Sequence, residues 1–107
     1  MPFYQLKITV LEDKDDEFVR NLHSLWFEFL KEDGCRSYEV YRDIEKKNAF
    51  SLTGEFDNHA ALEKHFRTRN FEILLGAART LGESVRLIIS DILETGGYEL
   101  AKSKIGR

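Results

Sequence analysis

Residues 36–56, RSYEVYRDIEKKNAFSLTGEF, decide the fold that we predict for this chain. Residues 36–43 are rich in the aromatic and β-branched types that favour strands. Residues 44–48, IEKKN, have the composition of a polar turn, and in residues 49–56 apolar side chains alternate with polar ones. Two strand patterns joined by a short polar segment predict an antiparallel hairpin at the centre of the chain.

The segment before the hairpin predicts a strand followed by a helix. Residues 3–11 alternate with the period of two that a half-buried strand shows. A helix is expected to begin near Asp15, because acidic residues are favoured at the positive end of the helix dipole. Its apolar side chains recur at helical spacing and are Phe18, Leu22, Leu25, Trp26 and Phe29. Gly34 is expected to end this helix in the left-handed conformation.

The segment after the hairpin predicts helices and a last strand. Asn58 is a plausible N-cap for a helix over HAALEKHF, and RTRN is expected to break it. A second helical run is expected from Phe71 to about Leu81, and Gly82 marks its end. Residues 84–93, SVRLIISDIL, then have the composition of a strand with bulky side chains on both faces.

The predicted order of elements is βαββαβ, which indicates an α+β domain. With right-handed crossovers, this order gives the ferredoxin-like arrangement, a four-stranded antiparallel sheet with its helices on one face. A length of 107 residues fits one compact domain, since domains most often have roughly 100–150 residues. We assign residues 1–94 to this domain and residues 95–107 to a C-terminal tail.

The face of the sheet opposite the helices predicts a homodimer. The last strand offers apolar groups to both sides, with Val85, Leu87, Ile89 and Leu93 on one and Ile88 and Ile92 on the other. Because the chain has too few residues to cover both faces, we expect two copies to pack sheet to sheet. The tail has Gly96 and Gly97 as a joint and Tyr98 and Leu100 as anchors. It either reaches across to the other subunit or frays as a free terminus.

Composition excludes several classes of function. The net charge is -3 and the basic residues form no stripe, so nucleic-acid binding is not expected. No apolar run approaches the roughly 20 residues of a membrane-spanning helix, so no membrane association is expected. Cys35 is the single cysteine and no signal peptide opens the chain, which predicts a cytoplasmic protein.

Two stretches, LKEDGCRSYEVYRD and FSLTGEFDNHAALEKHFRTRNF, resemble the antibiotic biosynthesis monooxygenase (ABM) family of the dimeric α+β barrel superfamily. The resemblance runs from about Lys7 to Ile92. Its motif positions are Gly34-Cys35, the SYEVY strand, Glu55-Phe56, the helix start from Asp57 to His65, and Asn70-Phe71. The chain departs from the family at Phe56, where tryptophan is common, and at Asn70, where many members have histidine.

The resemblance implies several possible activities. Family members carry out cofactor-free oxygenation of phenols and quinols, haem degradation or isomerisation of a phosphorylated signalling sugar, and some have no known activity. We expect a cofactor-independent monooxygenase that acts on a small phenolic or quinol-like substrate and needs no metal. The alternatives are a non-catalytic dimer that binds a small ligand and a sugar-phosphate isomerase. In the haem branch the axial histidine would fall at Leu75, and strand one lacks the expected asparagine.

His65 is the candidate catalytic residue, because it matches the helix histidine of the family and imidazole can accept a proton near neutral pH. The alternative is a histidine that only packs. His59 lies six residues away, about 120° around the helix, so the two cannot share a ligand. His59 and Glu63 have the H-x-x-x-E spacing of two metal ligands, but no third ligand is evident. His23 is expected at the boundary of the core.

The candidate substrate-binding residues are Trp26, Tyr41, Glu55, Phe66 and Asn70. With Phe29 and Phe71, the aromatic residues Trp26 and Phe66 are expected between helices and sheet, where they either pack as core or line the substrate pocket that the resemblance implies. Tyr41 and Glu55 offer polar contacts to a substrate or face the dimer interface. A sugar phosphate would require cations in the pocket, so inward-pointing Arg67, Arg69 or Arg79 would favour the isomerase. Cys35 is expected to be a small residue of the helix-to-strand turn.

Overall fold

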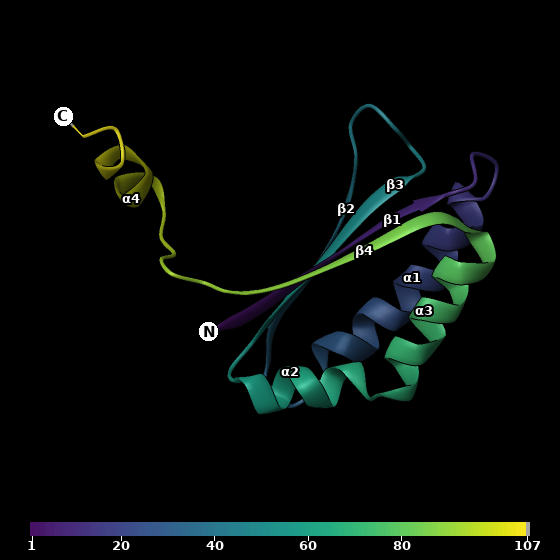
Figure 1. Ribbon diagram of the computed structural model, residues 1–107, viewed down its shortest axis with the longest axis horizontal. Coiled ribbons are helices and arrows are strands. Elements are labelled where there is room, and N and C mark those ends of the chain that lie inside the picture. Colours follow the sequence, from purple (N-terminus) through teal and green to yellow (C-terminus); the bar gives the residue numbers. More distant parts are fainter. Residues whose placement is uncertain (107) are drawn as a thin grey trace.

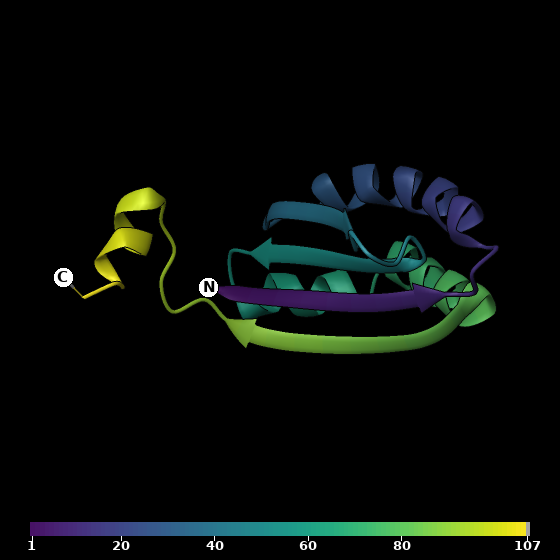
Figure 2. The same cartoon turned by 90° about the horizontal axis from the view of Figure 1, so that it is seen from above.

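A computed structural model describes residues 1–106 and has a four-stranded sheet as its centre (Figure 1). The strands are β1 (Pro2–Val10), β2 (Cys35–Arg42), β3 (Ala49–Phe56) and β4 (Gly82–Asp91). Their order across the sheet is β2-β3-β1-β4, and all neighbours are antiparallel. The helices α1 (Asp15–Leu30), α2 (His59–Phe66) and α3 (Arg69–Leu81) cover one face (Figures 1 and 2). The ferredoxin-like α+β prediction is therefore confirmed.

The helix α1 lies on the sheet through the predicted apolar stripe. Phe18, Leu22, Leu25 and Phe29 are buried, and Trp26 is half-buried. Gly34 ends the connection to β2 with a φ of +83°, a backbone conformation that side chains with a Cβ rarely adopt. A Cβ on Gly34 would also lie 2.6 Å from the Cβ of Ala61. Glycine thus permits both the turn and the close approach of α2.

Side-chain caps separate α2 from α3 at the predicted break. The Asn58 side chain accepts a hydrogen bond from the Ala61 amide at 2.8 Å. The Thr68 hydroxyl accepts from the Phe71 amide at 3.1 Å and donates to the carbonyl of His65 at 2.8 Å. Because Thr68 is the N-cap, α3 begins at Arg69, two residues before the predicted start.

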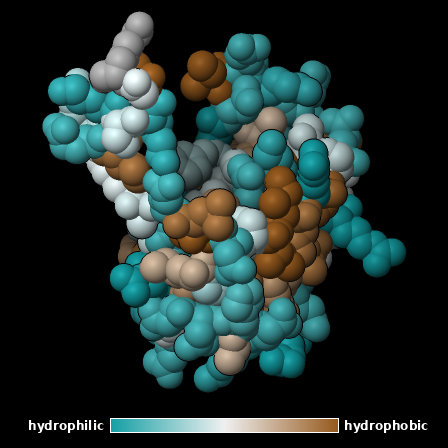
Figure 3. Space-filling view, turned by 60° about the vertical axis from the view of Figure 1, so that its left-hand side comes forward, coloured by the Kyte–Doolittle hydropathy of each residue, from teal (hydrophilic) through white to brown (hydrophobic). Residues whose placement is uncertain are grey.

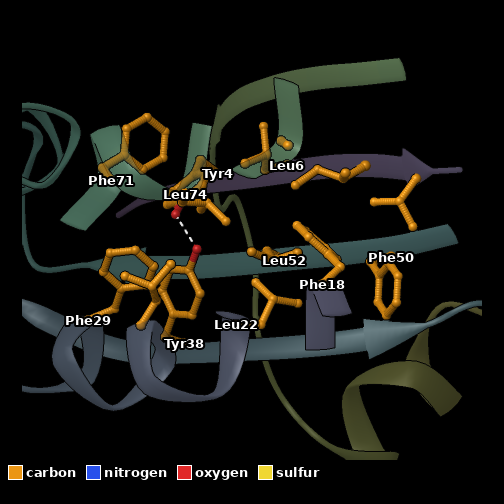
Figure 4. Packing of buried hydrophobic residues seen from close by; sticks show 14 of the residues in the cluster. Tyr4, Leu6, Phe18, Leu22, Phe29, Tyr38, Phe50, Leu52, Phe71 and Leu74 are labelled. Atoms are coloured by element: carbon orange, nitrogen blue, oxygen red, sulfur yellow. Dashed lines mark hydrogen bonds between the residues drawn. The ribbon is translucent and has the colours of Figure 1, made fainter. Parts of the chain in front are cut away.

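Core side chains fill the space between the helices and the sheet (Figure 4). The predicted inward face of β1 is buried, as are Phe50, Leu52 and Phe56 of β3. Phe29 and Phe71 are buried in the same core, and Phe66 packs against it. Of the two possibilities for these phenylalanines, the structure shows core packing, because the aromatic rings contact one another there, with the Phe66 and Phe71 centroids 5.0 Å apart.

The open face of the sheet is more polar than the sequence suggested. The register places Gln5 and Lys7 of β1 beside Thr53 and Ser51 of β3 on this face. The two-sided character of β4 is confirmed, with Ile88 paired to Gln5 on the open face. The other apolar side chains of β4 instead share the helix-facing side and are half-exposed; they are Val85, Leu87 and Ile89. Exposed apolar side chains form patches on the molecular surface (Figure 3).

The C-terminal segment extends away from the domain. It contains a short helix, α4 (Tyr98–Ser103), that the sequence analysis did not predict and none of whose residues is buried. It lies on the side of the sheet away from α1, α2 and α3 (Figure 1). The radius of gyration is 15.3 Å, against about 13 Å for a compact domain of this length. None of the helices described in residues 1–106 has the length and apolarity required to cross a bilayer.

Candidate functional site

His65 lies at the centre of a buried hydrogen-bonded chain. It occupies the last turn of α2 and its side chain is 0% exposed. Its Nε2 lies 2.7 Å from the hydroxyl oxygen of Tyr4 on β1, and its Nδ1 lies 2.8 Å from Oε1 of Glu32, which follows α1. The rings of Phe29, Phe56 and Phe71 surround the imidazole, with centroid distances of 4.8 to 5.1 Å. Both ring nitrogens are therefore engaged inside an apolar shell.

The chain continues from Tyr4 to Tyr38 on β2. The two hydroxyl oxygens are 2.5 Å apart (Figure 4), although the residues lie on strands separated by β3. The register pairs Gly54 of β3 with both tyrosines. A Cβ on Gly54 would lie 2.9 Å from Cε1 of Tyr4 and 3.1 Å from Cδ2 of Tyr38. The absence of a side chain at Gly54 lets the two rings meet across the middle strand.

Burial sets the protonation states in this chain. It lowers the pKa of His65 to about 4, so the imidazole is neutral at pH 7, and it raises the pKa of Tyr4 and of Tyr38 far above neutrality. Burial raises the pKa of Glu32 to about 7, although Lys64 acts in the opposite direction. Because burial keeps the imidazole neutral, the 2.8 Å contact between Nδ1 of His65 and Oε1 of Glu32 is a hydrogen bond between a neutral ring and a carboxyl group that titrates near pH 7.

The donors in the chain can point in one consistent direction. An ionised carboxylate only accepts hydrogen bonds, so Nδ1 of His65 carries the proton that Glu32 accepts. The Nε2 atom then accepts from the Tyr4 hydroxyl. Because Tyr4 has a single proton to donate, its oxygen accepts from the Tyr38 hydroxyl. Every proton in the chain is thus directed from Tyr38 toward Glu32.

Three members of this chain were not among the sequence-based candidates. Tyr4 carried only a strand pattern, and Tyr38 stood in the motif shared with the ABM family without an assigned role. The strand pattern could have indicated a role for both tyrosines, because a buried hydroxyl group needs a hydrogen-bond partner. Glu32 gave no such signal, since its contact with His65 depends on how the end of α1 meets α2.

An open pocket of about 870 Å³ lies between α1 and β2, beside the hydrogen-bonded chain. Its apolar lining is Val19, Leu22, Trp26, Val40 and Phe50, and its polar lining is Asp16, Arg20, His23, Glu39, Tyr41 and Arg42. Tyr38 also lines the pocket, whereas His65 does not. The pocket and the buried histidine are therefore separate places in the fold, and Tyr38 is the residue that belongs to both.

The structure brings only some of the sequence candidates to this pocket. Trp26 lines it, and its indole Nε1 donates to the carbonyl of Tyr38 at 2.6 Å. Tyr41 lies at the rim, where its hydroxyl donates to the Glu39 carboxylate. Glu55 lies on the open face of the sheet, paired in register with Phe3 of β1. The site thus receives polar groups from β2 rather than from β3.

The remaining candidates lie outside the pocket. Phe66 packs in the core against Tyr4 and Phe71, with centroid distances of 5.1 and 5.0 Å. Asn70 lies in the first turn of α3 and is half-buried. Cys35 begins β2, its thiol donates weakly to the carbonyl of Ser37, and burial raises its pKa to about 11. A thiol with that pKa is not a nucleophile near neutral pH.

The other two histidines and the three arginines considered for a sugar phosphate are surface residues. His59 is exposed and its Nε2 lies 3.0 Å from the Asp91 carboxylate, so its separation from His65 is confirmed. His23 is exposed at the pocket rim, outside the core boundary expected for it. The arginines that would have favoured a sugar phosphate, Arg67, Arg69 and Arg79, are all exposed. Leu75, at the position of a haem ligand, is exposed on α3. Within residues 1–106 no three histidine, cysteine or carboxylate groups cluster to hold a metal.

Known proteins similar to this chain share its fold. A curated relative, an uncharacterised protein of Synechocystis sp., is 33% identical over 89 residues. The match covers 82% of this chain but only 60% of the relative, so the chain spans about 60% of that protein's length. A crystal structure of a candidate antibiotic biosynthesis monooxygenase from Deinococcus radiodurans matches with a TM-score of 0.84 at 18% identity. That match covers 92% of this chain and 98% of the other.

A conserved protein from Methanosarcina mazei Go1 matches with a TM-score of 0.76 at 25% identity, over 84% of this chain and 91% of the other. At these identities the structural matches establish the fold. A family model gives the more specific result, since the model described as antibiotic biosynthesis monooxygenase matches residues 1–73. Because this match covers more than half of the residues of the chain, the chain belongs to the antibiotic biosynthesis monooxygenase family.

Proposed function

We propose that this protein is a cofactor-independent monooxygenase that acts on a small phenolic or quinol-like substrate in the pocket between α1 and β2. The observation that carries the proposal is the position of Tyr38, which lines the pocket and hydrogen-bonds to the buried chain through Tyr4. The apolar floor around Trp26 and Val40 suits an aromatic ring. Tyr38 then offers an oxygen through which the proton of a substrate hydroxyl can leave.

The chemistry requires no external reductant. Removal of the hydroxyl proton gives an electron-rich phenolate that can react with O₂. A phenol and O₂ together contain the atoms of a quinone and water, so one oxygen atom enters the ring and the other leaves as water. The phenol supplies all four electrons that reduce the two oxygen atoms of O₂. His65 acts in this proposal through Tyr4 and Tyr38 and not by touching the substrate, because its side chain is 0% exposed.

A ligand-binding protein without catalysis is the second candidate. The same pocket would serve it, and the buried hydrogen bonds would then only stabilise the core. A sugar-phosphate isomerase is less well supported, because Arg67, Arg69 and Arg79 are exposed. Arg20 and Arg42 do line the pocket, but Arg42 is 3.9 Å from the Asp15 carboxylate and stacks over the Phe50 ring.

Oxygen uptake with a panel of phenols and hydroquinones tests the activity. The wild type is expected to consume O₂, and Tyr38→Phe is expected to lower kcat by about 10²-fold, the scale of a lost proton transfer. Tyr98→Phe is the matched control, since Tyr98 lies on α4 with its side chain 76% exposed and does not line the pocket. Thermal unfolding checks that both variants fold.

Fluorescence separates the two candidates. Trp26 is the single tryptophan and lines the pocket, so its emission reports ligand binding. Quenching by the phenols with no oxygen uptake would overturn the monooxygenase proposal in favour of the binder. If the phenols neither quench Trp26 nor support oxygen uptake, both the monooxygenase and the ligand-binding protein are excluded for this pocket.

We also propose that two copies pack through the open faces of their sheets, in a cytoplasmic homodimer whose tails cross. Proteins of this family are commonly dimeric. A helix of six residues is not stable alone in water, yet α4 buries none of its residues against its own chain, and the side chain of Tyr98 is 76% exposed. A second copy would supply the missing contacts. Sedimentation as a monomer at micromolar concentration would contradict this assembly.

A further inference from the structure

Glu32 is placed to receive a proton from the pocket through the buried chain. It follows α1, its side chain is 19% exposed, and its Oε1 is 2.8 Å from Nδ1 of His65. It does not line the pocket between α1 and β2. The chain of hydrogen bonds through Tyr4 and His65 therefore connects Tyr38, a pocket-lining residue that is 2% exposed, with a carboxyl group outside the pocket.

We propose that Glu32 is the terminal proton acceptor of this chain, so that a phenolic proton released in the pocket passes through Tyr38, Tyr4 and His65 to the Glu32 carboxylate. This inference rests on the proposed function, because the pocket must hold a phenol. It names a carboxyl group, and not His65, as the base that holds the proton while the substrate is an anion.

The second oxygen of Glu32 supports this role. Oε2 is buried and has no hydrogen-bond partner among residues 1–106. A buried charge without partners is unfavourable, so the environment favours the protonated carboxyl group. A residue that served only to orient His65 would need a single acceptor atom, which Oε1 already provides. An ionised carboxylate whose second oxygen is buried without a hydrogen-bond partner is instead stabilised when it takes up a proton.

The transfer balances in protons and charge. The ligand hydroxyl gives its proton to the Tyr38 oxygen, and the Tyr38 proton moves to the Tyr4 oxygen. The Tyr4 proton moves to Nε2 of His65, and the Nδ1 proton moves to Oε1 of Glu32. Three bonds of 2.5, 2.7 and 2.8 Å carry these steps within the protein. The ligand becomes a phenolate, Glu32 becomes neutral, and His65 changes its tautomer without becoming charged.

The groups around Glu32 suit an acceptor near neutral pH. Burial raises its pKa to about 7, and Lys64 of α2 is the cation that acts against this shift. His65 of α2 contacts it directly, and the other titratable groups coupled to it are Tyr4, Cys35 and Tyr38. Each of those three has a raised pKa and stays neutral at pH 7. Glu32 is therefore the member of the chain that titrates in this range.

Ionisation of para-nitrophenol in the pocket tests the transfer without any requirement for oxygenation, since its phenolate absorbs visible light. The variant is Glu32→Gln, which retains an oxygen to accept from Nδ1 but cannot take up a proton. The matched control is Glu28→Gln, an exposed residue in the last turn of α1, four residues before Glu32. Bound nitrophenol at pH 7 is expected to show about tenfold less phenolate relative to phenol in Glu32→Gln than in the wild type or the control.

The outcomes separate this inference from the oxygenase. Equal phenolate in Glu32→Gln and the wild type would overturn the role of Glu32. Nitrophenol that fails to quench Trp26 would also overturn it, because the chain would have no phenolic donor. If the ionisation of nitrophenol depends on Glu32 but the protein consumes no O₂, the proton transfer to Glu32 is supported and the monooxygenase activity is excluded. A ¹⁵N spectrum showing His65 protonated at Nε2 with ionised Glu32 would contradict the direction of the chain.

Discussion

Gly54 determines at the scale of one residue whether the hydrogen-bonded chain exists. It lies on β3 between Tyr4 and Tyr38, and both rings occupy the space in which a Cβ would stand. The strands on either side of β3 would otherwise hold two tyrosine hydroxyls too far apart to bond. The 2.5 Å contact between the hydroxyls therefore depends on a residue that makes no polar contact of its own through a side chain.

The substitution Gly54→Ala is expected to destabilise the protein by about 1–3 kcal/mol, the usual effect of adding a methyl group to a packed core. The added Cβ would lie 2.9 Å from Cε1 of Tyr4. The control is Gly76→Ala, where no atom lies within 4 Å and replacement within α3 is expected to stabilise by about 0.5–1 kcal/mol. Urea denaturation measures both, and equal stability of Gly54→Ala and wild type would contradict the packing argument.

The pH dependence of stability is expected to change in Glu32→Gln. The folded-state pKa of Glu32 is about 7, above its ordinary value of 4.5, so its contribution is complete below pH 4.5 and is lost as the pH rises through 7. His65 has the opposite behaviour, because its folded-state pKa is about 4, below 6.5. Its contribution is present above pH 6.5 and is lost as the pH falls through 4.

Glu32→Gln removes only the first of these contributions. Relative to Glu28→Gln, it is therefore expected to become more stable as the pH rises from 4.5 to about 7. Urea denaturation of both variants across this range measures the difference. Parallel stability profiles would show that the pKa of Glu32 is not raised in the folded state.

At the scale of elements, the junction between α2 and α3 positions His65. Thr68 caps α3 by accepting from the Phe71 amide and also holds the last turn of α2 through the His65 carbonyl. The sequence analysis recognised a break at RTRN but placed the start of α3 two residues late, at Phe71. A loop composition and an N-cap are hard to tell apart there, because Thr is typical of both.

Thr68→Ala is expected to cost about 1 kcal/mol, because the amide of Phe71 loses its cap. Thr80→Ala in the last turn of the same helix is the control, since Thr80 is exposed. Thermal and urea unfolding compare the two. If Thr68→Ala destabilises the protein less than Thr80→Ala does, the Thr68 hydroxyl does not cap α3.

At the scale of the whole molecule, the uncovered surface decides how copies assemble. The open face is largely polar, with Phe3, Tyr41 and Ile88 as its bulky apolar groups. A separate apolar row, Val85, Leu87 and Ile89, lies half-exposed on the helix-facing side of β4. Both surfaces are available in one chain, so the face used by a dimer can be tested on a single strand.

Adjacent residues on β4 distinguish the two faces. Ile88→Glu places a charge on the open face and is expected to convert the proposed dimer to a monomer. Leu87→Glu places the same charge on the helix-facing side and is expected to leave the dimer intact. Sedimentation velocity measures both variants. Dissociation of Leu87→Glu alone would locate the interface on the apolar row of β4 and contradict the sheet-to-sheet arrangement.

Local sequence patterns predict the class of fold, the order of the elements from β1 to β4 and the inward faces of β1, α1 and β3. Hydrophobic periodicity is a local property, so the buried faces of β1 and α1 can be predicted from the sequence alone. The left-handed turn at Gly34 and the N-cap at Asn58 can be predicted as well, because a turn or a cap depends on a few neighbouring residues.

The site depends on contacts between residues far apart in the sequence. The chain from Tyr38 to Glu32 joins residues from four separate parts of the sequence, and hydrogen bonds require their atoms to meet within a few tenths of an ångström. Strand register, the space left at Gly54 and the approach of Glu32, after α1, to His65 of α2 set those distances. For the same reason His65, the residue that sequence marked for direct chemistry, was found buried behind two tyrosines.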